Sequence, residues 1–474
     1  MPLRIYNTLT QKKEEFIPVK KGEAGIYNCG PTVYGYFHVG NARNFIVIDA
    51  MRKYLEFSGY KVKLVQNVTD VDDKIINKAK AEQVTPKEIA EKFTADYFED
   101  LERLGVRRAD YNPKATEHIK EMQDLIKLLI EKGEAYEING DVYFSVGRAK
   151  ERGYGKLSHK KIEELEAGSR IDVNEQKKDP LDFALWKKDK EDGISWDSPW
   201  GKGRPGWHTE CCVMSVKYLG QPFDIHSGGI DLVFPHHENE LAQVEAAYGS
   251  AGSFAKYWLH NGHLNIKGQK MSKSLDNFLL VRDILKTRSA GVVRFFLLSA
   301  HYRSPLDWTE ENVANAVNGF TELVHTQGRI NAILEKPLAA EGAGRTGLTE
   351  KAAAAEAKFI LSMDDDFNTA AAIGALFEFA AEIKNILKKK DWELTPENRE
   401  ELRKTGEKLT SLSACLGLTL ASGGLTPEAA ALVSERERAR TAKDWTASDE
   451  LRKKIDAAGY CAEDSRFGQI VFKK

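Results

Sequence analysis

Cysteine is scarce in this chain. Its 474 residues include five cysteines, an odd number, and no two of them form a Cys-x-x-Cys pair. So few thiols exclude a disulfide-stabilised scaffold and suit a reducing compartment. The missing Cys-x-x-Cys pair also excludes a self-contained zinc finger, so any metal site must draw ligands from distant parts of the chain.

Long apolar runs and an excess of charge of either sign are also lacking. No uninterrupted apolar run approaches membrane-spanning length, and the start, Met-Pro-Leu-Arg, has no signal-peptide core. The 69 basic and 71 acidic residues leave a net charge of -2, which excludes a globally basic nucleic-acid binder but permits a local patch. We therefore expect a cytoplasmic protein, not attached to a membrane, of roughly two to four domains.

Residues 24–68 predict a strand, a helix and a second strand. The run AGIYNCG ends at Gly30-Pro31, a helix then carries Phe45 and Ile48 on one face and stops near Gly59, and KVKLVQNV alternates as a strand does. Two strands joined by one helix imply a parallel unit of an α/β fold, and ligands bind beyond the carboxyl ends of such strands. That places Cys29 at the mouth of a site.

The stretch 201–240 concentrates residues that bind metals. It holds four of the eleven histidines and two of the five cysteines, a mixture typical of a zinc site. If HHENELAQVEAAYG is a helix, His236 and Glu240 are four residues apart and share a face, whereas His237 points about a quarter-turn away. We expect Cys29 and Cys211 to supply the sulfurs of the site.

Each of these residues also has an ordinary structural explanation. Buried cysteines act as small hydrophobes, and histidines cap helices or fill cores. Cys211 and Cys212 are neighbours, so only one of them is expected to reach a shared metal. Four ligands at one strand end and along one helical face favour the metal site.

His38, Gly40 and Asn41 lie at the turn that enters the first predicted helix. Asn41 could simply cap that helix. The functional alternative is a nucleotide site, in which helix N-terminal amides and the imidazole face a triphosphate while Gly40 leaves room for it.

A second motif, Lys270-Met271-Ser272-Lys273-Ser274, supports the nucleotide site. The two motifs, in this order and at this separation, resemble the HIGH and KMSKS signatures of class I aminoacyl-tRNA synthetases. That resemblance implies an ATP site with Mg²⁺ in which His38 and Asn41 hold phosphates from one side. Lys270, Ser272 and Lys273 would close over the pyrophosphate from the other. The last histidine of the HIGH signature is Asn41 here, which still donates a hydrogen bond.

Three further stretches narrow the resemblance to the cysteinyl-tRNA synthetase family. They are CGPTVY from Cys29, GWHTEC ending at Cys211, and FPHHENE ending at Glu240. The family binds one zinc ion through Cys, Cys, His and Glu, which implies Cys29, Cys211, His236 and Glu240 as ligands and the substrate cysteine as a thiolate.

The substrate pocket is predicted from residues around the metal set. Trp207, His208 and His226 are candidate walls, and Thr69 and Asp231 are candidates for the end that binds the ammonium group. Because zinc distinguishes a thiol from a hydroxyl directly, no editing site is expected.

The rest of the chain predicts an insertion and helical domains. Residues 135–146 look strand-like, 182–206 look like a loop rich in Trp, Pro and Gly, and MDDDFNTAAAIGALFEFAAEIKNIL looks like a helix of a bundle. The last segment predicts a helix and a terminal hairpin. The resemblance implies a bundle that docks tRNA(Cys), with Arg440, Trp445, Asp449 and Asp464 contacting the anticodon.

The expected organisation is a Rossmann-type parallel-sheet catalytic domain with a connective insertion, an α-helical bundle and a small C-terminal anticodon-binding domain. The predicted boundaries are 1–115 and 201–265 for the two halves of the catalytic domain, 116–200 for the insertion, 266–315 for the KMSKS junction, 316–420 for the bundle and 421–474 for the last domain. We expect a monomer.

Four functions fit some of these features. The first is ATP-dependent activation of L-cysteine followed by its transfer to tRNA(Cys). The second is an ATP-dependent ligase that joins cysteine to a small amine in thiol-cofactor biosynthesis, which would not need the tail after about residue 420. A small nucleotidyltransferase would be a single domain and would not combine a KMSKS motif with a zinc site. A non-catalytic zinc module on a helical scaffold would leave both ATP motifs unexplained.

Overall fold

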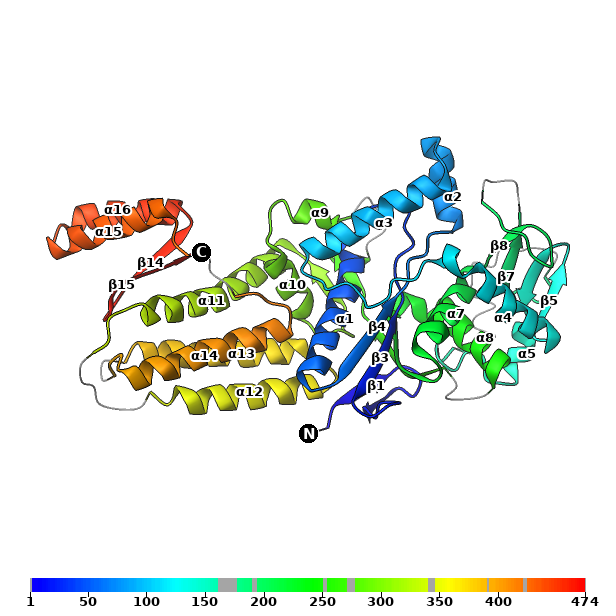
Figure 1. The fold of residues 1–474 in the computed structure, drawn as a ribbon, viewed down its shortest axis with the longest axis horizontal. Coiled ribbons are helices and arrows are strands. Elements are labelled where there is room, and N and C mark those ends of the chain that lie inside the picture. Colours follow the sequence, from blue (N-terminus) through cyan, green and yellow to red (C-terminus); the bar gives the residue numbers. More distant parts are fainter. Residues whose placement is uncertain are drawn as a thin grey trace. The chain divides into compact units, whose positions relative to one another are not determined.

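The computed structural model describes residues 2–160, 177–189, 194–249, 254–270, 278–339, 346–389, 392–420 and 424–473. The chain divides into two compact units. Pro2–Arg288 and Tyr302–Asp307 form the first, here called the sheet unit, and Ser289–His301 and Trp308–Lys474 form the second, here called the helical unit. In Figure 1 the colours of the chain run from blue to green through the sheet unit and from green through yellow and orange to red through the helical unit.

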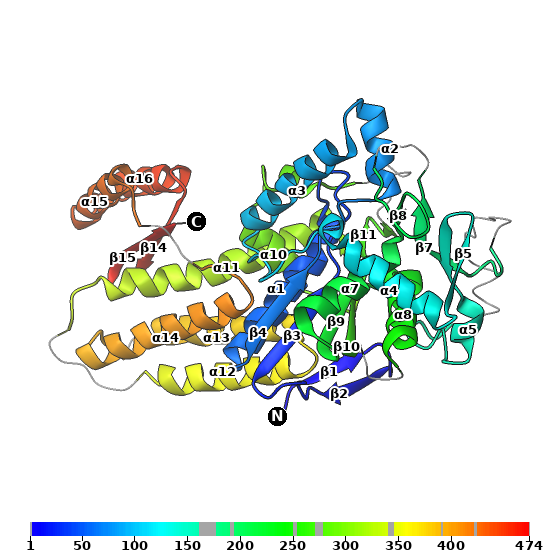
Figure 2. The same ribbon diagram turned by 45° about the vertical axis from the view of Figure 1, so that its right-hand side comes forward.

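A four-stranded parallel sheet forms the centre of the sheet unit (Figure 2). Its strands, in spatial order, are β10 (Ala255–Asn261), β9 (Phe223–Gly229), β3 (Glu23–Asn28) and β4 (Lys61–Gln66), and each neighbouring pair is parallel. Helices α1 (Val39–Phe57) and α7 (Trp207–Leu219) pack against these strands. The predicted strand–helix–strand unit is thereby confirmed, including the helix end at Gly59, whose φ is 90°.

Shorter elements surround the central sheet. They are the hairpin β1 (Arg4–Asn7) and β2 (Lys12–Glu15), the helices α2 (Asp73–Glu82), α3 (Pro86–Arg103), α8 (Glu238–Tyr248) and α9 (Val281–Ile284), and the strands β11 (Leu264–Ile266) and β12 (Gln269–Lys270). Cys29 follows β3 directly, and its amide donates to the carbonyl of Ser227 in β9 at 3.0 Å. The carboxyl edge of the sheet therefore brings distant segments together, as expected for parallel strands.

A second sheet lies in the predicted insertion, 116–200, and extends a few residues beyond it. Helices α4 (Ile119–Glu131) and α5 (Val146–Lys150) accompany four antiparallel strands, β5 (Ala135–Ile138), β6 (Asp141–Phe144), β7 (Phe183–Lys188) and β8 (Gly203–Pro205). The expectation of a loop over 182–206 was wrong for β7 and β8. The glycine that suggested a loop is required by close packing, because a Cβ at Gly203 would lie 2.4 Å from the indole nitrogen of buried Trp186.

The helical unit begins with a bundle and ends with a small α/β module. The bundle helices are α10 (Ala290–Leu298), α11 (Glu310–Leu334), α12 (Leu348–Asp364), α13 (Thr369–Leu387) and α14 (Pro396–Cys415). The short strand β13 (Leu306–Trp308), between α10 and α11 in the chain, is not part of the bundle but of a sheet with β11 and β12. Helices α15 (Pro427–Thr441) and α16 (Trp445–Ala457) precede the hairpin β14 (Tyr460–Ser465) and β15 (Gly468–Lys473). The predicted terminal hairpin is confirmed.

The helix predicted from Met363 is broken near its start. Asp366 and Phe367 have φ values of 64° and 49°, and α13 begins only after Asn368, whose side chain accepts a hydrogen bond from the amide of Ala371 at 3.0 Å. A local Asn cap competes with helix continuation, which the apolar period alone does not reveal. Among the described residues, no helix is both long enough and apolar enough to cross a membrane.

Candidate metal centre and nucleotide cleft

Four predicted metal ligands meet at the carboxyl edge of the central sheet. The thiols of Cys29 and Cys211, the imidazole of His236 and the carboxylate of Glu240 offer ligand atoms that all lie within 4.8 Å of one another, and all four residues are buried. Cys29 follows β3 and Cys211 lies in α7. His236 lies in the short π-helical turn Val233–His237 that leads directly into α8, and Glu240 lies in the first turn of α8. The parallel sheet thus joins residues that are about 200 positions apart in the chain.

The distances within this group suit a tetrahedral ion. The two sulfur atoms are 3.7 Å apart, and two thiolates bound tetrahedrally to zinc would be about 3.8 Å apart. His236 Nε2 lies 3.7 Å from Cys211 Sγ and 2.9 Å from Glu240 Oε1. The last contact confirms the predicted pairing of His236 with Glu240 across one helical turn.

The pKa values of the two thiols and the carboxylate in this group are shifted in different directions. Burial raises the pKa of Cys29 well above its ordinary value. Burial also opposes ionisation of Cys211, but the hydrogen bond from Cys29 and the adjacent His236 lower its pKa to about 6. Although burial again opposes it, contact with His226 and His236 lowers the pKa of Glu240 to about 2. A thiolate and a carboxylate are therefore held side by side, and both are ligands that zinc accepts.

Two other histidines contact the group from outside. His226 Nε2 lies 2.7 Å from Glu240 Oε2, and His237 Nε2 lies 3.1 Å from Cys29 Sγ. Together with Cys29 and Glu240 they form a second set whose ligand atoms lie within 4.8 Å of one another. The helical spacing predicted that His237 points away from the metal ligands. The structure instead places it beside one of them, Cys29.

His237 is also the start of a chain of side chains that the sequence did not suggest. Its Nδ1 lies 2.8 Å from His260 Nε2, and His260 Nδ1 lies 2.8 Å from the hydroxyl of Thr8. Burial lowers the pKa of His237 well below its ordinary value and that of His260 to about 3, so both rings are neutral at pH 7. Three elements far apart in sequence contribute, so no local motif could have revealed this chain.

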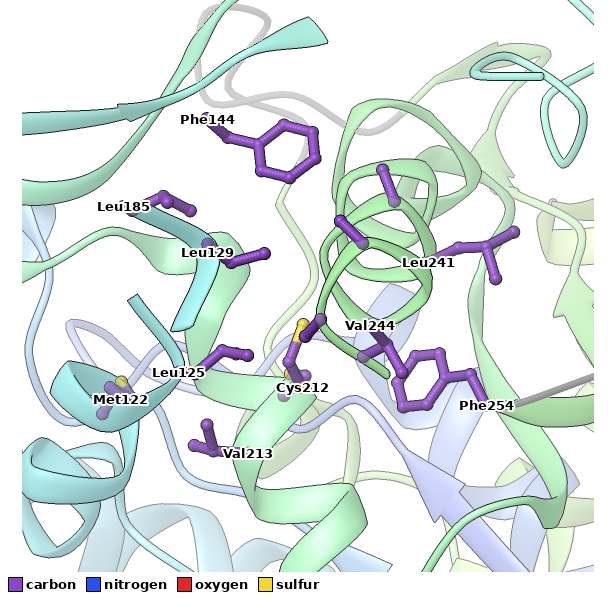
Figure 3. Packing of buried hydrophobic residues seen from close by; sticks show 14 of the residues in the cluster. Met122, Leu125, Leu129, Phe144, Leu185, Cys212, Val213, Leu241, Val244 and Phe254 are labelled. Carbon is purple, nitrogen blue, oxygen red and sulfur yellow. The ribbon is translucent and has the colours of Figure 1, made fainter. Parts of the chain in front are cut away.

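Cys212 belongs to the apolar core. It packs in a cluster with Leu125, Val213 and Val244, between α7 and α8 (Figure 3). Its Sγ lies 3.3 Å from the carbonyl of His208 in the preceding turn of α7, and burial raises its pKa well above the ordinary value. It is absent from both possible ligand sets among the described residues. The expectation that only one of the neighbouring cysteines reaches the site agrees with this geometry.

A cleft of about 750 Å³ opens beside the metal group. Cys29, Trp207, Asp231, His38 and Asn41 all contribute to its lining. The possible metal ligands and the turn His38-Val39-Gly40-Asn41, here called the HxGN turn, therefore share one cleft.

The predicted substrate residues differ in how they reach this cleft. Trp207 stacks on His236, with ring centroids 4.0 Å apart and planes at 17°. His208 and His226 lie behind the lining, where His208 Nδ1 is 3.1 Å from His236 Nδ1. Thr69 is also set back, and its hydroxyl donates to Glu210 at 2.7 Å. Glu210 is a buried carboxyl that the sequence did not single out.

The HxGN turn has the expected position at a helix start. His38 is the N-cap of α1, and its Nδ1 accepts a hydrogen bond from the amide of Asn41 at 3.3 Å. Gly40 and Asn41 line the cleft. The ring of Phe278 meets the His38 ring edge-on at 4.8 Å, and the amide of Val281 donates to the carbonyl of Phe37. The chain that leaves the KMSKS motif is thus hydrogen-bonded to the HxGN turn.

The KMSKS residues themselves are described only at their first position. Lys270 is placed by its backbone as the end of β12, whereas Ser272 and Lys273 lie outside the described residues.

The predicted anticodon residues lie in the module after residue 424. Asp464 in β14 accepts from Arg440 at 2.7 Å and from Arg436 at 3.0 Å, and these contacts lower its pKa although partial burial opposes the shift. Trp445 begins α16 with 59% of its surface exposed, and Asp449 is exposed on the same helix. Arg440 and Asp464 are therefore brought together, while Trp445 is presented to solvent.

Three families match successive parts of the chain. The tRNA synthetases class I (C) catalytic domain matches residues 15–318, the DALR domain matches 358–421, and the cysteinyl-tRNA ligase anticodon binding domain matches 422–471. The first match covers more than half of the chain.

Curated relatives are similar along almost the whole length. The chain is 47% identical to a cysteine–tRNA ligase of Heliobacterium modesticaldum, over 99% of both chains. It is 49% identical to a cysteine–tRNA ligase of Geobacillus thermodenitrificans, over 98% of both. Among solved structures, Mycobacterium tuberculosis methionyl-tRNA synthetase in complex with methionyl-adenylate has a TM-score of 0.62 at 14% identity. It covers 90% of this chain and 96% of its own, and it shares the fold. The chain belongs to the cysteine–tRNA ligase family of class I tRNA synthetases.

Proposed function

We propose that this protein activates L-cysteine with ATP and transfers it to tRNA(Cys). One observation carries the proposal: the buried Cys29–Cys211–His236–Glu240 group opens, through Cys29 and Trp207, onto the same cleft as the HxGN turn. A sulfur-rich metal site beside a phosphate-binding helix start suits an enzyme that must choose a thiol substrate and join it to a nucleotide.

Of the two ligand sets, we assign Cys29, Cys211, His236 and Glu240 to zinc. Their sulfur–sulfur and sulfur–nitrogen distances of 3.7 Å leave room for an ion between them. Only one pair in this set, His236 and Glu240 at 2.9 Å, is at the distance of a direct hydrogen bond. The second set has two such contacts, from His237 to Cys29 at 3.1 Å and from His226 to Glu240 at 2.7 Å. His226 and His237 then orient Glu240 and Cys29 from outside, as the outer partners of metal ligands do.

The site must separate cysteine from serine, which has nearly the same size. An apolar pocket gains only about 1–3 kcal/mol from such a small difference. Zinc, when bound, supplies a preference for a thiolate over a hydroxyl. We assign Trp207 to the wall around the side chain and Asp231 to the ammonium group. His208 supports this wall from behind, through its contact with His236. Thr69 is set back from the cleft, where its hydroxyl donates to Glu210, so we assign it to supporting this end of the pocket from behind.

Activation joins the cysteine carboxylate to the α-phosphorus of ATP. A carboxylate oxygen bonds to that phosphorus while its bond to the pyrophosphate oxygen breaks. Positioning and charge neutralisation supply most of the catalysis of such a step. We assign His38, Gly40 and Asn41 to the phosphates on the helix side, and Lys270, Ser272 and Lys273 to the departing pyrophosphate with its Mg²⁺.

In the transfer step a terminal hydroxyl of the tRNA attacks the cysteine carbonyl carbon and loses its proton. The bond between that carbon and the oxygen bridging to phosphorus breaks, and AMP leaves with this oxygen. We assign recognition of the anticodon to Arg440, Trp445, Asp449 and Asp464. An exposed tryptophan suits stacking on an unpaired base, the usual mode of single-strand RNA recognition. The match of residues 422–471 to an anticodon-binding family disfavours the ligase that joins cysteine to a small amine.

The test is cysteine-dependent exchange between ATP and pyrophosphate, followed by transfer of labelled cysteine to tRNA(Cys). We expect both reactions. Exchange without transfer would favour the small-amine ligase, and the absence of exchange would refute the proposal. Serine and methionine serve as control amino acids and are expected to give no exchange.

A further inference from the structure

Arg43 is a fully buried arginine in the second turn of the helix that carries the HxGN motif. Its side chain is inaccessible to solvent. Gly40, Asn41 and Asn44, which flank it on α1, all line the cleft. A charged side chain at such a position is costly unless its donors are satisfied.

The guanidinium of Arg43 reaches a second segment that lines the cleft. Its Nη1 donates to the carbonyls of Gly262 and His263, each at 2.8 Å, and its Nη2 donates to the carbonyl of Ser304 at 2.6 Å. Gly262 and His263 follow β10 directly and line the cleft as well. One side chain therefore sets the spacing between the start of α1 and the chain after β10.

The charge of Arg43 persists in this position. Burial lowers its pKa to about 10, which leaves the guanidinium protonated at neutral pH. Hydrogen bonds from a charged donor are roughly twice as strong as neutral ones. The guanidinium is also planar, so its donors have fixed directions and hold the three carbonyls in one arrangement.

The chain around Gly262 is constrained from its other side too. A Cβ at Gly262 would lie 2.6 Å from the carbonyl oxygen of Arg303 and 2.7 Å from that of Ser304. The Gly262 amide donates to the carbonyl of Tyr302 at 2.8 Å, and the amide of Leu306 donates to the carbonyl of His263 at 3.0 Å. Because the backbones are already in contact, a change at Arg43 shifts the cleft wall instead of being absorbed by empty space.

We propose that Arg43 is a positioning residue of the ATP site, which holds the wall formed by residues 261–264 at a fixed distance from the HxGN turn. The inference rests on the proposed function in one respect, that ATP is the ligand held between these walls. The four assigned metal ligands lie on other segments, so we expect a change at Arg43 to affect the ATP subsite more than the metal group.

The variant Arg43→Lys tests the inference. Lysine keeps the charge, but a compact ammonium cannot donate along the three directions of the planar fork. Since small displacements of a positioned substrate reduce rates steeply, we expect the KM for ATP to rise about tenfold in the exchange reaction. The KM for cysteine should change less than about twofold, and zinc content should equal that of the unmodified protein, because the metal group keeps its contacts.

The matched control is Arg294→Lys in the helical unit. Arg294 is also buried, with 1% exposure, and donates to a backbone carbonyl, that of Leu416, at 3.1 Å. Its replacement should lower the unfolding temperature and leave the KM for ATP unchanged. A comparable rise in the KM for ATP in both variants, or parallel rises in both KM values of Arg43→Lys, would overturn the positioning role.

Two further measurements keep the test decisive. Gly262→Ala displaces the same wall without altering the guanidinium, so it replaces Arg43→Lys if that variant does not fold. A selective rise in the KM for ATP supports the inference, and unchanged or parallel KM values overturn it.

Direct binding of ATP, measured by equilibrium dialysis without cysteine, separates this inference from the proposed function. Weaker ATP binding by Arg43→Lys supports it even if cysteine activation fails, and equal binding contradicts it.

Discussion

The variant His226→Ala should weaken zinc binding although His226 is not assigned as a ligand. The imidazole of His226 is fully buried, stacks on Trp258 with ring centroids 4.5 Å apart, and lies 2.7 Å from Glu240 Oε2. Removing it leaves one carboxylate oxygen of Glu240 without this donor and lets the carboxylate rotate away from the metal group. Loss of such an outer partner costs about 10–100-fold in metal affinity, equivalent to about 1.4–2.8 kcal/mol.

The assay is a zinc competition titration against a chelator of known affinity, with the metal content of each preparation measured in parallel. His118→Ala is the matched control, because His118 is equally buried in the sheet unit and contacts the carbonyl of Lys114 at 2.7 Å, outside both ligand sets. It should bind zinc as the unmodified protein does. Unchanged zinc affinity in His226→Ala, together with a raised KM for cysteine, would refute the reasoning. His226 would then be a wall of the substrate pocket, as the sequence predicted.

Three further outcomes follow from other contacts. His38→Ala should slow pyrophosphate exchange about 100–1,000-fold and lower the free energy of unfolding by about 1 kcal/mol, because the N-cap of α1 is lost. His38→Asn should restore the stability measured by urea unfolding but not the exchange rate. Full exchange by His38→Ala would contradict the assignment. Lys187 and Arg204 lower the pKa of half-exposed Asp73 to about 2 against the effect of burial, so these contacts add stability above about pH 4 that is lost as the pH falls toward 2. Asp73→Asn should therefore cost less than about 1 kcal/mol at pH 7 and nothing near pH 2, and a pH-independent difference would count against this ion pair. Trp445→Ala should raise the KM for tRNA(Cys) about tenfold and leave exchange unchanged; an equal loss of exchange would place Trp445 outside anticodon recognition.

The sequence predicted the features that depend on regular geometry. Parallel strands bring their carboxyl ends to one edge, so Cys29 could be placed at the site mouth from the strand pattern alone. Helical spacing paired His236 with Glu240, and the two side chains are 2.9 Å apart. Both predictions needed only the regular geometry of strands and helices, which does not depend on the rest of the fold.

The features that the sequence did not predict depend on contacts between distant segments. His237 reaches Cys29, and His260 reaches Thr8, across a sheet whose strand order was unknown. Strand β8 was mistaken for a loop because Gly203 serves close packing against Trp186 and not a turn. Arg43 gave no signal either, since its carbonyl partners lie more than 200 residues away.

The measurement that tests the central claim most directly is cysteine-dependent pyrophosphate exchange as a function of bound zinc. Protein stripped of metal by a chelator and refilled in steps should regain exchange in proportion to zinc, up to about one ion per chain, with serine giving no exchange at any loading. Cys211→Ser should bind little zinc and remain inactive. Normal activation of cysteine by a metal-free preparation would contradict the claim that zinc, held by Cys29, Cys211, His236 and Glu240, selects the substrate.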